Sequence, residues 1–276
     1  MIRRLLRKVF PIAASQRFII LCHQRSGSNM LMDVVGHHPQ VHYYGQLYKE
    51  EPSHRARLDG LAGVRLRGNT FDDSLVGRTA FETAERDPAQ RSSERNFVEF
   101  TQGFYRRATR ANRGGWIGGK LHGGTLHEDE LAELFLGPTE YRVIVLHRQN
   151  LLAAAISWYQ ARELNQWRRN ADQSVTTPAL TMDIATLGWF IDNTRRDVRL
   201  WQQLCVRHGV RPLVLTYETA AADPFATASQ IWRFLDLPVP TDPIRPGTKK
   251  LIKSYNHITN IGQIRSELAG PTNGYV

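Results

Sequence analysis

The sequence predicts an α/β protein in which a parallel β-sheet of about four to five strands is flanked by helices. Two stretches, residues 17–35 and 141–159, carry the same order of strand, polar loop and helix. In each, a short apolar run is followed by apolar residues at helical spacing. Because parallel strands must be joined by crossovers, strands that alternate with helices are typical of a parallel sheet covered on both faces.

The first strand-to-helix unit begins with residues 17–23, a short apolar run bounded by polar residues. Such a run is typical of a strand that is buried on both faces of a sheet. It leads into the polar loop 24–28, and apolar residues then recur at helical spacing over residues 30–35. Gly36 follows the last of them, and glycine at this position commonly ends a helix.

The second unit begins with a predicted strand over residues 141–148, and the apolar side chains after it fall on one helical face. These side chains are Leu151, Leu152, Ala155, Ile156 and Tyr159. Two more apolar runs, at residues 115–121 and 212–218, predict further strands. Residues 225–235 have the spacing of a helix, so the alternation of strand and helix continues to the end of this region.

Composition places the chain among ordinary globular proteins. Of its 276 residues, 41% are hydrophobic and 22% are charged, which excludes the disordered, collagen-like and coiled-coil classes. No apolar run reaches the roughly 18 residues that a membrane-spanning helix needs, so we expect a soluble protein. Cys22 and Cys205 are the only cysteines, too few for a disulfide framework or a structural zinc site, and they favour a reducing, cytoplasmic compartment.

The formal net charge is +10 at pH 7, and such a charge attracts anionic partners. Nucleotides, nucleic acids and acidic membranes are all compatible with it, which leaves peripheral contact with an anionic membrane open. No nucleic-acid-binding motif accompanies the charge, and arginine pairs such as 106–107 and 168–169 are typical of solvated helix faces. We therefore expect no nucleic-acid partner.

Three segments outside the strand-to-helix units have compositions of their own. Residues 1–16 are expected to be a basic N-terminal extension, because they lack the apolar core of a signal peptide. Residues 45–95 are polar, with both signs of charge, and are typical of an insertion on the acceptor side of an enzyme. Residues 241–276 are rich in proline, glycine and lysine and are expected to be a C-terminal tail. We expect residues 1–276 to form one domain.

The loop after the first strand has the residues of an anion-binding site. Backbone N–H groups and the positive end of the next helix converge there. Gly27 permits close approach of an anion, and Arg25 can add a bidentate charged contact. Ser26, Ser28 and Asn29 complete the candidate site. The alternative is an ordinary turn with an exposed arginine, and the absence of G-x-x-x-x-G-K-[ST] argues against binding of a nucleoside triphosphate.

A second candidate site follows the predicted strand 141–148. Arg148 ends this strand, and Ser157 lies on the following helix, nine residues later. In a parallel sheet both residues would lie near the carboxyl edge of the strands, where ligands bind.

Three separated motifs resemble the sulfotransferases that use 3′-phosphoadenosine 5′-phosphosulfate (PAPS), in particular the bacterial carbohydrate group that includes the trehalose and Nod-factor enzymes. The motifs are residues 24–31 (QRSGSNML), 118–121 (GGKL) and 147–158 (HRQNLLAAAISW). A late pattern of strand and helix at residues 213–238 is similar as well. The resemblance covers residues 17–238.

This resemblance implies a P-loop-like parallel sheet, the sulfotransferase fold, and transfer of a sulfuryl group from PAPS to a hydroxyl of a carbohydrate or glycolipid. In the family, the first loop binds the 5′-phosphosulfate, which here corresponds to Arg25 and residues 26–29. The second motif binds the 3′-phosphate, which here corresponds to Arg148 and Ser157. Sulfuryl transfer depends on in-line positioning and charge stabilisation, so no metal is implied.

The catalytic base is where the sequence departs from the family. Many members carry a glutamate after a glycine beyond the first helix, whereas Gln46 stands at this position, and an amide cannot take a proton. Residues 120–122 are similar to the Lys-x-His of cytosolic sulfotransferases, in which the histidine is the base. This implies that His122 is the base and that Lys120 stabilises developing charge, since histidine titrates near neutral pH.

Two glutamates, Glu50 and Glu51, are the alternative candidates for the catalytic base. Three further histidines are expected to cap or decorate the first loop region, namely His37, His38 and His42.

Several of these residues are also compatible with a purely structural role. Lys120 is also compatible with a solvated charge at a strand end, and His122 with a loop histidine. Trp158 and Tyr159 are expected to be core aromatics and not an adenine platform, because apolar residues at helical spacing usually pack. Since Gln46 replaces the family's carboxylate, the alternative function is a non-catalytic module of the same fold that binds a nucleotide or an anionic lipid.

Overall fold

The computed structural model describes residues 16–47, 101–106, 108–109, 115–137, 141–164, 178–242, 244, 255–270 and 273. The expected N-terminal extension, residues 1–16, lies outside the described residues except for Gln16. The expected acceptor-side insertion, residues 45–95, also lies outside them after Leu47.

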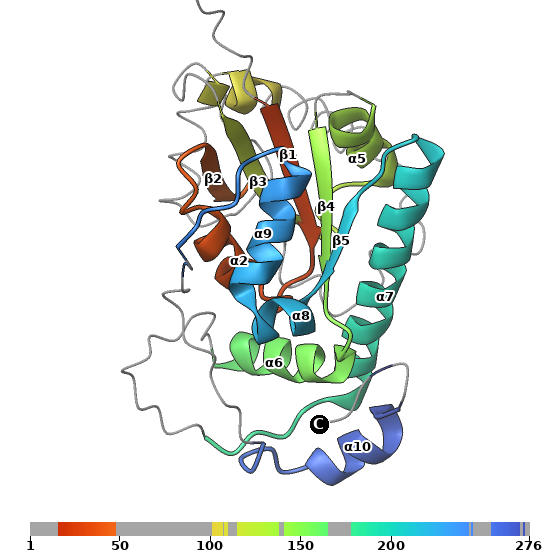
Figure 1. Ribbon diagram of the computed structural model, residues 1–276. Helices are drawn as coiled ribbons and strands as arrows, with labels where there is room; N and C mark the ends of the chain where they lie inside the picture. The colour runs from red at the N-terminus through yellow and green to blue at the C-terminus, as the bar shows by residue number, and fades with distance from the viewer. Residues whose placement is uncertain are drawn as a thin grey trace, which may run out of the picture. The chain divides into compact units, whose positions relative to one another are not determined.

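Five strands form one sheet in the order β2-β3-β1-β4-β5 (Figure 1). They are β1 (Gln16–Cys22), β2 (Val41–Gln46), β3 (Trp116–His122), β4 (Tyr141–His147) and β5 (Leu213–Thr216). β2 pairs with β3 and β4 with β5 in parallel, which confirms the predicted α/β class with a parallel sheet flanked by helices. Because the chain leaves the central strand β1 toward one edge and later crosses to the other, the strand order reverses between β1 and β4. Ligands of open parallel sheets bind at such a reversal, beyond the carboxyl ends of the strands.

Strand β2 is an element that the sequence pattern did not predict. Of its residues only Val41 is buried, so it lacks the apolar run that marks the inner strands. Gly45 has a φ of 81°, and the pairing register with β3 shifts between Tyr43 and Gln46. This short, irregular edge strand contains His42, which therefore lies in a strand and not in a loop.

Strand β5 ends at Thr216, two residues before the predicted end at residue 218. The hydroxyl of Thr216 accepts a hydrogen bond from the backbone N–H of Thr219 at 3.2 Å, which is an N-cap. Helix α8 (Tyr217–Ala222) begins immediately after it. The predicted strand was too long because threonine and tyrosine favour strands, whereas here the threonine caps a helix.

The described chain divides into two compact units, one of which comprises residues 21–37, 144–203 and 212–276. Its helices are α2 (Ser28–Val35), α6 (Leu151–Glu163), most of α7 (Ile184–Arg207), α8, α9 (Pro224–Phe234) and α10 (Ile261–Leu268). Helix α10 lies in the expected C-terminal tail, whose weak periodicity did not predict it.

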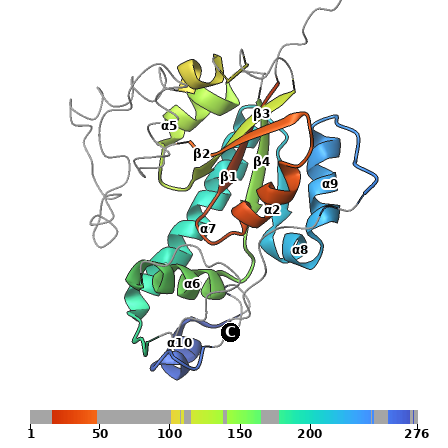
Figure 2. The same cartoon turned by 90° about the vertical axis from the view of Figure 1, so that its left-hand side faces the viewer.

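Aromatic side chains hold the helices of this unit together. The indole N–H of Trp232 on α9 donates to the backbone oxygen of Val35 at the end of α2, at 3.2 Å. The two helices accordingly lie side by side in both views (Figures 1 and 2). Trp158 of α6 stacks on Phe190 of α7 with ring centroids 4.9 Å apart. Trp158 and Tyr159 are both buried, as expected of core aromatics.

The other unit comprises residues up to 20, residues 38–143 and residues 204–211. It contains β2, β3, the short helix α5 (Glu128–Leu131) and a π-helical segment at Ala132–Leu136. Phe18 of β1 fills the space beside Gly118, where an added Cβ would lie 2.0 Å from the ring. The hydroxyl of Tyr105 donates to the backbone oxygen of Phe18 at 3.3 Å.

Among the helices of the described residues, none has both the length and the apolar character that crossing a membrane requires.

Candidate functional site

The loop between β1 and α2 has a backbone shape that suits an anion. Arg25 has a φ of 63° and Gly27 a φ of 80°, so two left-handed residues turn the chain here. Alternation of left-handed with other conformations directs successive N–H groups toward one side. Helix α2 begins at Ser28 and receives no side-chain cap from its N-cap residue. The positive end of α2 therefore points from this loop toward a site that can hold an anion.

Two serine hydroxyls of this loop are buried. Ser26 is 2% exposed and Ser28 is 5% exposed, whereas Asn29 is exposed. Within the part of the chain that the structure describes, Oγ of Ser26 has no hydrogen-bond partner. A buried hydroxyl left without a partner costs roughly 1–3 kcal/mol. A phosphate or sulfate oxygen bound at the loop would supply that partner, so these residues fit a phosphosulfate group.

The second predicted motif contacts this loop directly. Nε of Arg25 donates a hydrogen bond to Oγ of Ser157 at 2.8 Å. Nη1 of Arg148 donates to the backbone oxygen of Arg25 at 3.5 Å. Three residues predicted from two separate motifs therefore form one cluster within one unit, although 132 residues separate Arg25 from Ser157. Arg25 is half-buried, so it is not the exposed arginine of the alternative interpretation.

Positive charge is concentrated in this cluster. Burial and, next, the charge of Arg148 lower the pKa of Arg25 from its usual value. Because arginine keeps its proton in proteins, the lowered pKa means that the charge of Arg25 is held at an energetic cost, first because it is buried and next because Arg148 repels it. An anion with more than one negative charge would relieve this repulsion and accept charge-assisted hydrogen bonds from both side chains.

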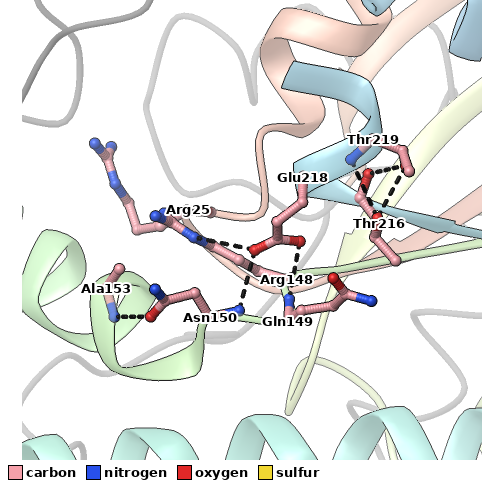
Figure 3. Close-up of polar contacts among 8 residues, drawn as sticks. All are labelled: Arg25, Arg148, Gln149, Asn150, Ala153, Thr216, Glu218 and Thr219. Atoms are coloured by element: carbon pink, nitrogen blue, oxygen red, sulfur yellow. Dashed lines mark hydrogen bonds and ion pairs between the residues drawn. The ribbon is translucent and has the colours of Figure 1, made fainter. Parts of the chain in front are cut away.

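Glu218, drawn in Figure 3, and its neighbour Tyr217 complete the cluster, although the sequence pattern did not predict either as a site residue. The guanidinium carbon of Arg148 lies 4.4 Å from the centroid of the Tyr217 ring. Nε of Arg148 lies 4.0 Å from Oε1 of Glu218. The signal that could have found them is Thr216, the last residue of β5, because threonine is a residue type favoured at N-caps.

Protein groups occupy the N-terminus of α6. Glu218 accepts hydrogen bonds from the backbone N–H groups of Gln149 and Asn150, each at 3.0 Å. The side chain of Asn150 in turn accepts from the backbone N–H of Ala153 at 2.8 Å. Side chains therefore cap the N-terminus of α6, whereas no side chain of the N-cap residue caps α2. An anion bound between Arg148 and α6 must therefore be held by side chains and not by the end of the helix.

The other unit holds the remaining predicted residues of the described chain. Lys120 in β3 is 5% exposed, so the interpretation as a solvated charge at a strand end is wrong. Its register partner is Gln46 at the end of β2, and the backbone N–H of Leu47 donates to the oxygen of Lys120 at 3.1 Å. His122 is the last residue of β3. Gln46, Lys120 and His122 thus lie at the carboxyl ends of two adjacent strands.

The alternative bases Glu50 and Glu51 lie outside the described residues. His37 and His38 hydrogen-bond nearby backbone groups, as expected of histidines that cap a loop. Among the described residues, no group of three or more histidine, cysteine, aspartate or glutamate side chains is arranged to hold a metal ion.

Comparison with known proteins identifies the same family that these motifs resemble. The model of the sulfotransferase family matches residues 17–241. A search of curated proteins finds no match. Among solved structures, the sulfotransferase domain of the olefin synthase from Synechococcus PCC 7002 is similar, with 16% identity and a TM-score of 0.48 over 90% of this chain and 83% of that chain.

Two further solved structures are similar. A sulfotransferase from Alicyclobacillus acidocaldarius has 15% identity and a TM-score of 0.46, over 93% of this chain and 90% of that chain. A sulfotransferase from Mycobacterium avium has 13% identity and a TM-score of 0.45, over 87% of this chain and 69% of that chain.

Proposed function

The chain belongs to the sulfotransferase family, and from this premise we propose that it transfers a sulfuryl group from PAPS to a hydroxyl group of a carbohydrate or glycolipid. The observation that carries the proposal is the cluster in which Arg25 donates a hydrogen bond to Ser157, and Arg148 donates one to the backbone oxygen of Arg25. A donor with both a 5′-phosphosulfate and a 3′-phosphate needs two adjacent anion sites. The loop after β1 and the arginine after β4 offer such a pair.

Each half of the proposed donor site has its own physical support. Arg25 and residues 26–29 bind the 5′-phosphosulfate, supported by the start of α2, which has no side-chain cap, and by the unpartnered hydroxyl of Ser26. Arg148 and Ser157 bind the 3′-phosphate, supported by the side-chain cluster at α6. No metal is needed, because the arginines supply the positive charge.

The proposed chemistry uses residues at the ends of β1 and β3. His122 takes the proton of the acceptor hydroxyl, whose oxygen forms a bond to sulfur. The bond between sulfur and the 5′-phosphate oxygen breaks, and adenosine 3′,5′-bisphosphate leaves with the electron pair. Lys120 stabilises the charge that develops on the bridging oxygen, as the resemblance of residues 118–121 to the family implies. Arg25 stabilises charge on the phosphosulfate that it binds. Gln46 can orient the acceptor by hydrogen bonding, but it cannot act as the base.

The carbohydrate or glycolipid class of the acceptor rests on the resemblance of residues 24–31 and 147–158 to the bacterial carbohydrate sulfotransferases. A screen of sugar and glycolipid acceptors with labelled donor tests it directly. Transfer only to acceptors of another chemical class would refute this part of the proposal and leave the donor site intact.

Calorimetry with two nucleotides tests the donor site without knowledge of the acceptor. We expect adenosine 3′,5′-bisphosphate to bind at least about tenfold more tightly than AMP, because charge-assisted hydrogen bonds to the 3′-phosphate contribute ~1.5–3 kcal/mol each. Arg148→Ala should abolish the preference. Arg233→Ala, which removes an exposed arginine of α9, is the matched control and should keep it. EDTA should not change either affinity.

The outcomes separate the proposed function from its alternative. Equal affinity of the unaltered protein for both nucleotides would remove the case for a PAPS site. Tight binding of the bisphosphate without transfer to any acceptor in the screen would favour the non-catalytic module, for which Gln46 is the motivating residue.

A further inference from the structure

The first two residues of α8 touch both halves of the proposed donor site. β4 and β5 pair in parallel with His147 opposite Thr216. The two strands therefore end together, and the residues that follow them, Arg148 on one and Tyr217 with Glu218 on the other, leave the sheet at the same edge. This arrangement brings groups that are 68 and 69 residues apart in sequence into hydrogen-bonding distance.

Glu218 makes three polar contacts at this edge. Its Oε1 accepts the backbone N–H of Asn150, its Oε2 accepts that of Gln149, and Oε1 lies 4.0 Å from Nε of Arg148 (Figure 3). The first two contacts close the N-terminus of α6, where the helix dipole favours negative charge. The third places Oε1 at ion-pair distance from Nε of Arg148, so the same carboxylate lies beside both the start of the helix and the arginine.

Tyr217 fixes the same arginine from another side. The guanidinium of Arg148 lies over the Tyr217 ring, which is a favourable cation–π geometry. The same ring packs against Gly27, where an added Cβ would lie 2.4 Å from Cδ2 of Tyr217. The ring is thus in contact with the loop of one half-site and with the arginine of the other.

A carboxylate beside Arg148 could affect binding of the 3′-phosphate in two opposite ways. As a bare negative charge, Glu218 would repel the 3′-phosphate and lower its affinity. As a hydrogen-bonded clamp, it would hold Arg148 in the direction that a phosphate needs and raise the affinity, because pre-organised groups lose less entropy on binding. Two backbone hydrogen bonds fix the carboxylate, which favours the second expectation.

We propose that Glu218 is a positioning residue that orients Arg148 toward the 3′-phosphate of the donor and occupies the N-terminus of α6. This inference rests on the proposed function. Glu218 does not contact the donor in this role. It raises the selectivity of the site for a nucleotide with a 3′-phosphate over one without it.

Glu218→Gln provides the test, because the amide keeps the shape of the side chain but loses its charge and one acceptor oxygen. We expect the preference for adenosine 3′,5′-bisphosphate over AMP to fall roughly tenfold or more, while the affinity for AMP changes less than about threefold. Glu267→Gln is the matched control, since it makes the same change of charge at an exposed position of α10. Its preference should equal that of the unaltered protein.

The direction of the change decides between the two expectations. A preference for the bisphosphate that rises or stays constant in Glu218→Gln overturns the proposal, because that is the behaviour of a merely repelling charge. If Glu218→Gln does not fold, Glu218→Asp carries the test, since it keeps the charge but reaches less far. An intermediate preference supports the proposal and an unchanged one refutes it. If the unaltered protein itself shows no preference, the proposed function fails before this inference is tested.

Discussion

Nε of Arg25 donates a hydrogen bond to Oγ of Ser157 at 2.8 Å and thereby joins the loop after β1 to α6. Ser157 is 3% exposed, so the contact lies in an environment where a hydrogen bond to a charged group is stronger than in water. Under the proposed function, Ser157 contacts the 3′-phosphate as well as Arg25.

Ser157→Ala should weaken binding of adenosine 3′,5′-bisphosphate by roughly tenfold, the value of one hydrogen bond to a charged group. Binding of AMP should change less, because AMP has no 3′-phosphate. Calorimetry measures both affinities. Ser229→Ala is the matched control, since Ser229 is also a buried helical serine of the same unit and donates to the backbone oxygen of Phe225. Equal losses for both nucleotides in Ser157→Ala would refute a specific role at the 3′-phosphate.

Gly27→Ala should disrupt the anion-binding loop. The residue has a φ of 80°, and an added Cβ would lie 2.4 Å from the ring of Tyr217. The left-handed backbone alone costs an L-residue on the order of 1–3 kcal/mol. We expect the free energy of unfolding in urea to fall by at least this amount, and bisphosphate affinity to fall with it, because the N–H groups of the loop move.

Gly209→Ala separates the backbone effect from the steric one. Gly209 has a φ of 67° but no atom within 4 Å of an added Cβ. This variant should lose only the stability that the backbone conformation costs, and it should bind the bisphosphate normally. A loss of stability in Gly27→Ala no larger than in Gly209→Ala would show that Tyr217 moves aside without cost.

The parts of the fold that could be predicted are those whose signal is local. The inner strands β1 and β4 are continuous apolar runs, so the sequence pattern predicts them to within a residue or two. Arg25, Arg148 and Ser157 were predicted for a related reason, since each follows such a strand along the chain.

The remaining features depend on which strand ends meet, and this is not a local property. The contact of Glu218 with Asn150 exists because β5 lies beside β4, and strand order cannot be read from either segment alone.

Two elements were not predicted for other reasons. The side chains of β2 after Val41 are only half-buried, so the strand has no apolar run. The 24-residue helix α7 was also not predicted, although apolar residues at helical spacing, such as Leu187 and Ile191, are present in its sequence.

His122→Ala should lower turnover by on the order of 10²–10⁴, the usual contribution of a general base. Binding of adenosine 3′,5′-bisphosphate should not change, because the proposed base does not contact the 3′-phosphate. Gln46→Ala is the control at the neighbouring strand and should lower turnover less, since an amide can only orient the acceptor. Partial recovery of the His122→Ala variant by added imidazole would support proton transfer.

Near-normal turnover in His122→Ala would contradict the assignment of the base. The same assay on Glu50→Gln and Glu51→Gln would then identify which of the alternative carboxylates takes the proton. The assay uses labelled donor and whichever acceptor the screen finds.

We expect His147, the last residue of β4, to make the stability of the protein depend on pH. Burial lowers the pKa of His147 below its usual value of 6.5, although the charge of Glu218 and a hydrogen bond of the ring to the backbone of Arg148 offset part of the effect. Below pH 6.5 the unfolded chain therefore binds a proton at this residue more readily than the folded chain does. The free energy of unfolding should fall as the pH decreases from about 7 toward 5, and His147→Gln should show a smaller fall because glutamine does not titrate. Urea unfolding of both proteins at each pH measures the difference, and parallel curves would refute the role of His147.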